Sequence, residues 1–372
     1  MERPPIIMTN TLLFALSGLT ALIAVPWYGM THGYDLWQWS CFLLLFCYSG
    51  ISITAGYHRL WSHKAYKAHP ILQWILAIGG ALALQNSAQH WSSDHRRHHR
   101  HVDDNLKDPY SAGRGFWYSH IGWMLREYQR DIYNDYSNVR DLQNNPVVVF
   151  QHKHYLALTL ATNLGIPLLL GLVHGDLLGM LLLAGVLRMV MTHHTTFFIN
   201  SLAHIWGSQP FTDRNTARDN GILAFFTFGE GYHNFHHLFE NDYRNGIHWW
   251  QFDPTKWLIR SASWCGLTRD LRSCPEELIE QARLEMQLKR AQAKLRKRDD
   301  RELWQALLQE EYDKLSQQLQ HYYASRKRLL EQRKRKALAH YDKLKLQLEY
   351  RNLHDGFVAS KRNWSRLLAG IA

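Results

Sequence analysis

Histidines gather in two stretches of this 372-residue chain, and their spacing is typical of metal ligands. The stretch SSDHRRHHRH, from Ser92 to His101, contains four histidines, and GEGYHNFHH contains three. In a helix, residues at positions i, i+3 and i+4 lie on one face. Each stretch therefore predicts three imidazoles stacked on one helix face, supplied by His95, His98 and His99 and by His233, His236 and His237.

Three further histidines stand beside apolar segments. HRLWSH places His58 and His63 just after the second apolar segment, and NSLAH places His204 after the fourth, with Asn200 one turn earlier on the same face. Nine imidazoles exceed the four ligands of a tetrahedral zinc ion, so they favour two metals with four or five imidazoles each. Imidazole binds Zn, Cu, Fe and Ni alike, so the ligand type leaves the metal open.

Four apolar segments must position these residues. Each is long enough to cross a hydrocarbon core of about 30 Å at about 1.5 Å per residue. We therefore expect an all-α integral membrane protein with four spans and a histidine-rich helical cap that holds the two metals. Arg188 interrupts the last span and should point into the protein, because a charge that faces lipid is costly. The predicted spans are Thr11–Tyr28, Trp37–Tyr57, Tyr155–Val173 and Leu177–Ile199.

A fifth apolar segment, Ile71–Leu84, is short for a span and is expected not to cross. If it crossed, the histidines before it and after it would lie on opposite sides of the membrane. One metal centre could not then use both sets.

Charge predicts the orientation of the spans. Between His58 and Lys153 the chain carries 12 Lys and Arg residues, whereas the loops Gly29–Leu36 and His174–Asp176 carry none. By the positive-inside rule, we expect the metal centre and both termini on the cytoplasmic side of a multi-pass membrane protein.

The C-terminal part of the chain is mostly charged. Of the formal net charge of +11, the residues from Pro275 onward supply +8, from 22 Lys and Arg against 14 Asp and Glu. We expect a membrane domain over residues 1–274 and a basic helical tail over residues 275–372. An anionic membrane surface is favoured over nucleic acid as the partner of the basic residues, because the chain also has spans.

The tail lacks Pro and Gly from Glu276 to Asn352, which predicts one long helix. Apolar residues recur in it at intervals of seven. This spacing indicates a short coiled coil, through which copies could associate, or a helix on the membrane surface. The repeating residues are Leu308, Leu315 and Tyr322, then Ala337 and Leu344, and Tyr341 and Leu348.

HRLWSH, DHRRHH, NSLAH and GEGYHNFHH together resemble the histidine boxes of membrane acyl-CoA delta-9 desaturases, the stearoyl-CoA desaturase family. The resemblance covers roughly residues 37–270 and includes DPYSAGRGFWYSHIGWML and DYRNGIHWWQFDPTKWLI. It implies four spans, a cytosolic cap and a di-iron centre with two Fe ions. It also implies that the nine histidines are iron ligands and that Asn200 contacts one metal through water.

The family oxidises an unactivated C–H pair of a fatty acyl chain to a cis double bond, with dioxygen and two electrons. The substrate implied is a long-chain acyl-CoA or an acyl-lipid. The sequence contains neither a Gly-rich dinucleotide motif nor a set of cysteines for a cluster, so we expect a separate electron-transfer protein. Two alternatives remain: a membrane di-iron hydroxylase of the alkane or carotenoid type, and a histidine-rich membrane metal-binding or transport protein.

Substrate contacts are predicted from helix faces and charge. Phe46, Gly50 and Thr54 share a face of the second span with His58, so this face could set the floor of an acyl tunnel. The alternative is ordinary helix packing, in which Gly allows close approach. Basic residues of the cap could bind CoA phosphates or lipid headgroups, chiefly Arg114, Arg126 and Arg130. Carboxylates that could orient the ligands are Asp94, Asp103, Asp104 and Glu230.

Overall fold

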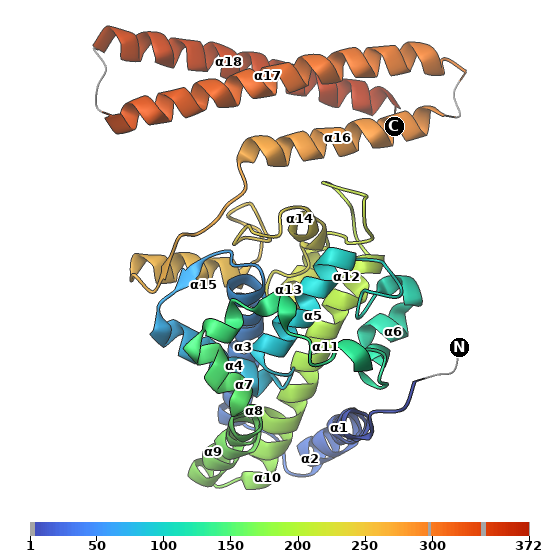
Figure 1. Ribbon diagram of the computed structural model, residues 1–372, viewed down its shortest axis with the longest axis vertical. Helices are drawn as coiled ribbons and strands as arrows, with labels where there is room; N and C mark the ends of the chain where they lie inside the picture. The colour runs from blue at the N-terminus through green and yellow to red at the C-terminus, as the bar shows by residue number, and fades with distance from the viewer. Residues whose placement is uncertain (1–3, 297–298, 336–339, 372) are drawn as a thin grey trace. The chain divides into compact units, whose positions relative to one another are not determined.

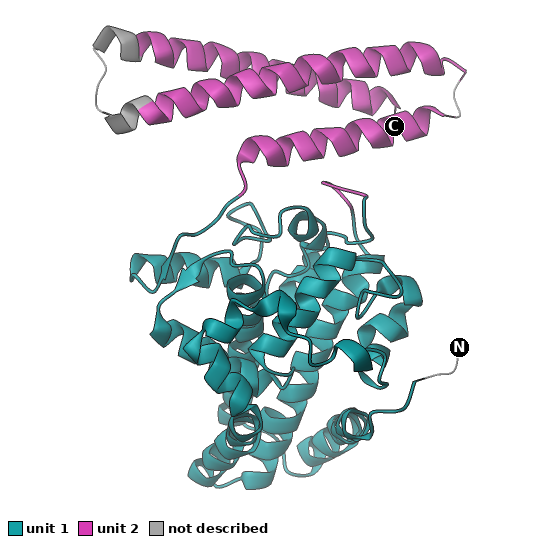
Figure 2. Cartoon of the chain, viewed as in Figure 1, with its two compact units in different colours: residues 1–208, 214–273 teal, residues 209–213, 274–372 magenta. Residues whose placement is uncertain are grey.

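The chain divides into two compact units. A computed structural model describes residues 4–296, 299–335 and 340–371 (Figure 1). The membrane unit comprises residues 1–208 and 214–273, and the tail unit comprises residues 209–213 and 274–372 (Figure 2).

Among the described residues, four helices are long and apolar enough to cross a membrane, as predicted. They cover Met8–Thr31, Leu36–Ser62, Tyr155–His174 and Leu177–Ile205. The second and fourth run past the predicted ends, so His58 and His204 lie on the spanning helices themselves. The component segments, several with wide π-type turns, are α1 Met8–Leu19, η1 Thr20–Ala24, α2 Val25–Thr31, α3 Leu36–Ile51, η2 Ser52–Ser62, α8 Tyr155–Leu160, η8 Ala161–Gly165, α9 Ile166–His174, α10 Leu177–Met180, η9 Leu181–Leu187, α11 Arg188–Asn200 and α12 Leu202–Ile205.

Carboxylates fix the loops at the end of the spans opposite the histidines. Asp35 begins α3 with a capping box, in which its side chain accepts from Gln38 N and the Gln38 side chain accepts from Asp35 N. Asp176 caps α10 by accepting from Gly179 N. The same carboxylate accepts from Tyr28 Oη and from Gln38 Nε2, each at 2.7 Å. These bonds tie the first, second and fourth spanning helices together.

Helices α4 (Pro70–Ala83) and α5 (Ala88–His101) form a bent pair. Their axes differ by 80°, and Leu84, which ends α4, adopts a left-handed φ of 53°. With 14 residues, α4 extends only about 21 Å at 1.5 Å per residue, less than the hydrocarbon thickness. This geometry agrees with the prediction that the segment does not cross by itself, and it turns α5 toward the histidine end of the spans.

Arg188 is fully buried and binds the end of α4. Arg188 Nη1 donates to Leu82 O at 2.7 Å, and Arg188 Nη2 donates to Asn163 Oδ1 at 2.9 Å. Asn163 Nδ2 in turn donates to Ala81 O at 3.2 Å. The last carbonyls of a helix have no partner within the helix. Side chains of the third and fourth spanning helices therefore donate hydrogen bonds to the last carbonyls of α4. Arg188 points inward, as predicted.

The remaining elements of the membrane unit surround the histidine end of the spans (Figure 1). Strand β1 (Lys67–Ala68) pairs antiparallel with β2 (Thr268–Arg269). The core between η2, α4, α7 and α15 is built on Tyr57, Leu76, Val148 and Ile259. The elements are η3 Ala112–Arg114, α6 Phe116–His120, η4 Gly122–Met124, η5 Arg130–Ile132, η6 Ser137–Val139, η7 Leu142–Asn144, α7 Pro146–Lys153, α13 Gly221–Phe226, α14 His233–Leu238 and α15 Pro254–Trp264.

The described residues of the tail unit form three helices, so the prediction of one long helix was wrong. They are α16 Glu276–Leu295, α17 Arg301–Arg335 and α18 His340–Ile371. Helices α17 and α18 lie side by side and run in opposite directions (Figure 1). A single helix would leave its apolar stripe in water. Folding back instead buries Leu284, Leu308, Leu315 and Trp364 in one core.

Several residues of the predicted seven-residue repeat pack inside the tail unit itself. Leu308, Leu315 and Tyr322 belong to the core of this unit, whereas Leu344 and Leu348 are exposed. Ala337 and the side chain of Tyr341 lie outside the described residues. Self-association through the tail stays a prediction.

Candidate metal centre

The nine predicted histidines come together from four elements at one end of the spans. His58 lies in η2 and His63 at its end, and His204 lies on α12. Helix α5 carries one triad and α14 carries the other. The turn before α14 requires Gly231, because a Cβ there would overlap the backbone of Ala224. This close approach lets α14 face α5.

The first group contains five imidazoles whose nitrogens face one another. Their candidate ligand atoms all lie within 4.8 Å of each other. His58 Nε2 is 3.0 Å from His236 Nε2, and His63 Nε2 is 2.8 Å from His95 Nε2. His99 Nε2 is 3.1 Å from His236 Nε2. Five nitrogens therefore surround one point.

The second group contains the other four imidazoles and has the same arrangement. His233 Nε2 lies 3.2 Å from His204 Nε2 and 3.0 Å from His237 Nε2. His98 Nε2 lies 3.4 Å from His237 Nε2. The triad on α5 is thus divided, since His98 belongs to this group and its two partners belong to the first.

The opposite ring nitrogens explain why a cation fits each group. His58 Nδ1 lies 2.9 Å from Glu230, and His98 Nδ1 lies 2.9 Å from Asp108. A carboxylate at Nδ1 holds the proton there, so Nε2 keeps a free lone pair. Lone pairs that converge repel one another unless a cation lies between them. The donor sets therefore fit two metal ions, with five imidazoles at one and four at the other.

Burial favours the neutral form, which a metal ligand needs, in five of these imidazoles. It lowers the pKa of His95, His233, His236 and His237 well below the ordinary value of a histidine. Burial also lowers the pKa of His99 to about 4, although Glu240 at 3.3 Å acts in the opposite direction. A neutral imidazole offers its lone pair at physiological pH.

Of the four carboxylates expected to orient ligands, Glu230 does so directly. Asp103 acts one step away, because it accepts from Thr216 Oγ1, and Thr216 Oγ1 lies 2.8 Å from His204 Nδ1. Asp94 instead pairs with His90 and Arg97. Asp104 accepts backbone N–H groups of the turn that follows it.

Two carboxylates at the site were missed from the sequence. Glu240 follows the end of α14 and reaches His99 on α5, so no local spacing marks it. Asp108 lies ten residues after His98 in an irregular loop. No periodic pattern marks Asp108, so only the path of the loop brings it to His98.

Arg59 holds Glu230 in its position next to the first group. Its guanidinium is 1% exposed. Arg59 Nη2 donates to Glu230 Oε1 at 2.9 Å, and Arg59 Nη1 donates to Asp253 Oδ2 at 3.1 Å and to Tyr243 O at 2.8 Å. Burial opposes ionisation of Glu230, but nearby His58 and Arg59 lower the pKa of its carboxyl below the ordinary value.

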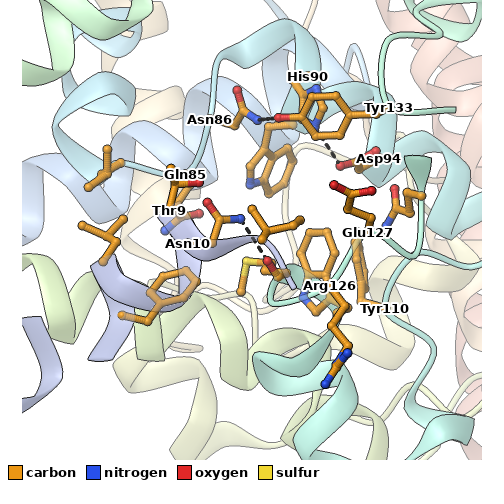
Figure 3. Close-up of a pocket in the computed structure, with 18 of the residues that line it drawn as sticks. Thr9, Asn10, Gln85, Asn86, His90, Asp94, Tyr110, Arg126, Glu127 and Tyr133 are labelled. Atoms are coloured by element: carbon orange, nitrogen blue, oxygen red, sulfur yellow. Dashed lines mark hydrogen bonds and ion pairs between the residues drawn. The ribbon is translucent and has the colours of Figure 1, made fainter. Parts of the chain in front are cut away.

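A cavity of about 640 Å³ adjoins the first group (Figure 3). Trp91 lines it and stacks on His95, with ring centroids 4.8 Å apart. Tyr110 also lines it, and its hydroxyl lies 3.2 Å from His95 Nδ1. The rest of the wall comes from α1, α11 and the segment around Trp123, and the cavity is largely apolar with a polar side toward Glu127 and Tyr133.

The predicted substrate contacts divide at this cavity. Arg126, Arg130 and Asn200 line it. Arg114 lies elsewhere, where its guanidinium stacks on Tyr118, 3.6 Å from the ring centroid.

The predicted tunnel face of the second span packs against protein in this structure. A Cβ at Gly50 would overlap the ring of Phe228, and Phe46 contacts the same ring with centroids 5.4 Å apart. Thr54 Oγ1 lies 2.6 Å from Thr255 Oγ1. None of the three predicted residues lines the cavity described above. Gly50 therefore takes part in close helix packing, which was the alternative to its predicted role in an acyl tunnel.

Comparisons with known proteins agree with this site. The model of the fatty acid desaturase family matches residues 35–263. The chain is 50% identical over 240 residues to the probable acyl-CoA desaturase of Schizosaccharomyces pombe, covering 64% of this chain and 50% of that protein. It is 46% identical over 274 residues to acyl-CoA desaturase 1 of Saccharomyces cerevisiae, covering 73% and 53%.

A third relative is stearoyl-CoA desaturase 5 of Bos taurus, 35% identical over 284 residues, with 75% of this chain and 83% of that protein covered. The chain spans about half the length of the two fungal relatives and most of the length of the bovine one. The range that the family model matches, residues 35–263, includes all nine histidines of the two groups. The chain belongs to the fatty acid desaturase family.

Proposed function

We propose that the protein introduces a double bond into a long-chain fatty acyl group, using dioxygen and two histidine-bound iron ions. The observation that carries this proposal is the convergence of nine buried imidazoles into groups of five and four. One zinc site would need only four ligands. Two adjacent redox metals suit the oxidation that the family performs.

Iron is the proposed metal on chemical grounds. Imidazole binds several divalent metals, but zinc has no redox chemistry. When bound, a pair of iron ions supplies the oxidation of a methylene pair with dioxygen and two external electrons. Asn200, which lies four residues before His204 on the fourth spanning helix, is proposed to contact one metal through water.

The residues of the chain prepare the site and exclude solvent. Glu230, Asp108 and Glu240 hold protons on the outward ring nitrogens and so direct the Nε2 lone pairs inward. Trp91 and Tyr110 line the cavity and contact His95 of the first group. An acyl chain in that cavity would be held away from water beside the metals.

The substrate is proposed to be a long-chain acyl-CoA with its double bond formed at the delta-9 position. The two fungal relatives carry acyl-CoA desaturase names, which supports the thioester. Arg126 and Arg130 on the cavity wall are suited to anionic phosphates, and Arg114 is a more distant candidate. The tunnel role of Phe46, Gly50 and Thr54 stays a prediction, tested by the chain lengths that a Gly50→Tyr variant accepts.

The orientation and the electron source complete the proposal. By the positive-inside rule, the charge of the loops supports a cytoplasmic location for the metal centre and both termini. Electrons are proposed to come from a separate protein on that side.

The test is expression in cells that make no unsaturated fatty acids, followed by mass spectrometry of double-bond positions. We expect delta-9 monounsaturated products. His95→Ala should abolish them, whereas His101→Ala is the matched control, because His101 lies on the same helix outside both groups. A hydroxylated product, or no product when iron and an electron donor are supplied, would overturn the proposal.

A further inference from the structure

The membrane unit exposes an aromatic surface on α13, on α15 and on the loop before α15. We call it the α13–α15 face. On α13 the exposed residues are Ile222, Phe225 and Phe226, and on the outward side of α15 the exposed ring is Trp257. The loop between α14 and α15 adds Trp249, which is 86% exposed, and Trp250.

Ring contacts through Phe252 join α13 to α15. The ring centroids of Phe225 and Phe252 lie 4.9 Å apart, and those of Phe252 and Trp257 lie 5.5 Å apart. A contiguous exposed surface of this kind is unusual on a protein region that faces water. Large aromatic side chains at the edge of a spanning bundle are instead typical of the membrane–water interface.

The depth of this face follows from its contacts with the second spanning helix. Phe228, two residues after α13, packs its ring directly on Gly50. Gly50 lies about 21 Å along the helix axis from Leu36, the start of this span, at 1.5 Å per residue. The hydrocarbon core is about 30 Å thick. The contact therefore lies inside the hydrocarbon layer, on the histidine side of its middle.

Helix α15 is attached slightly closer to the membrane surface. Thr255, in its first turn, bonds to Thr54 Oγ1 at 2.6 Å and donates to Phe228 O at 3.0 Å. Thr54 lies four residues beyond Gly50, about 6 Å further along the helix. The exposed ring of Trp257 thus lies near the boundary between acyl chains and headgroups.

Charge on α15 agrees with that depth. Lys256 turns inward, where its Nζ donates to the backbone oxygens of Gly246, His248 and Gln251 at 2.6, 2.5 and 3.1 Å. Arg260 is exposed on α15, three residues after Trp257 and so on the same face of the helix. Aromatic rings below a cation are suited to a lipid surface.

We propose that the α13–α15 face is immersed in the leaflet on the histidine side, with α13 among the acyl chains and α15 at the headgroups. The occupant is lipid, because Phe228 and Thr255 attach the face to the second span at a depth within the hydrocarbon layer and at its edge. Through the short link from α13 to α14, this immersion would fix the depth of His233, His236 and His237 below the membrane surface.

Single cysteines that carry an environment-sensitive fluorophore test the proposal in the full chain. The native cysteines, Cys41, Cys47, Cys265 and Cys274, are first replaced. Phe226→Cys and Trp250→Cys report on the face. Leu44→Cys is the lipid control, since Leu44 is exposed in the middle of the second span. Gln143→Cys is the water control, because exposed Gln143 lies beside Asp141, which pairs with Lys64 beyond the end of that span.

In phospholipid vesicles, labels on the face should emit at short wavelength and lose fluorescence when the lipids carry nitroxides, as the label at Leu44→Cys does. The label at Gln143→Cys should respond to aqueous iodide instead. The proposal is overturned if labels at both face positions respond to iodide alone. It is also overturned if they respond to neither quencher, because protein would then cover the face. Two positions guard against one variant that fails to fold.

Discussion

His98 Nδ1 lies 2.9 Å from the carboxylate of Asp108, while Nε2 of the same ring points at the second histidine group. The carboxylate is fully buried and also accepts hydrogen bonds from Asp103 N and Tyr110 N. Asp108 thus fixes both the tautomer and the orientation of His98. Metal sites commonly depend on such outer partners.

Replacing Asp108 by Asn should weaken metal binding to the second group. An amide cannot hold the Nδ1 proton as a carboxylate does, so we expect a loss of about 10- to 100-fold in metal affinity. Dialysis against graded chelator with metal analysis measures it. Asp104→Asn is the matched control, because this nearby carboxylate caps an exposed turn. Equal metal retention in the two variants would contradict the role given to Asp108.

Replacing Arg59 by Met should strongly destabilise the membrane unit. The change leaves Glu230 and Asp253 buried without their cation, which costs about 3–5 kcal/mol. Denaturant titration in detergent measures the loss in the free energy of unfolding. Lys67→Met removes an exposed ion pair with Asp270 and should cost about 0–1 kcal/mol. A similar small cost for both variants would show that the buried triad is unimportant.

Removing the metals should lower the thermal stability of the protein. Bound metal stabilises the folded state by about 2.7 kcal/mol when its free concentration is 100 times Kd. Without metal, nine lone pairs converge with no cation. We expect iron or zinc to restore the melting temperature after chelation, but iron alone to restore desaturation. An unchanged melting temperature after complete metal removal would refute the proposed centre.

Replacing Gly50 by Ala should destabilise the protein by about 1–3 kcal/mol, because the new methyl group overlaps the ring of Phe228. Combining it with Phe228→Ala should cost less than the sum of the single changes, by about 0.5–3 kcal/mol. Gly18→Ala is the control, since nothing lies within 4 Å of a Cβ there. Additive effects at Gly50 and Phe228 would mean that the contact is absent.

Local spacing in the sequence was enough to predict the nine histidines and the spans. The i, i+3, i+4 pattern places each triad on one face, and long apolar runs indicate spans. The same pattern gave no way to divide the α5 triad, because His95 and His98 go to different groups only when α14 approaches from the side.

Features that depend on distant contacts were missed. Asp108 reaches His98 through an irregular loop, and Gly50 meets Phe228 across 178 positions of the chain, a separation with no local signal. The tail was read as one helix because helix propensity continues through its charged residues. Its fold-back follows from the burial of Leu308 and Trp364 in one core, which is a tertiary effect.

The bonds from Arg188 and Asn163 to the end of α4 impose an order on biosynthesis. A ribosome releases α4 long before it releases these two side chains. Until then, the carbonyls of Ala81 and Leu82 lack the partners seen in the folded protein, and an unsatisfied carbonyl in lipid is costly. The nascent α4 must therefore stay at the membrane surface, or within the insertion machinery, until the last span has been made. Helix α5, which follows α4 and carries His95, His98 and His99, can reach its place only at the end of translation of the membrane unit.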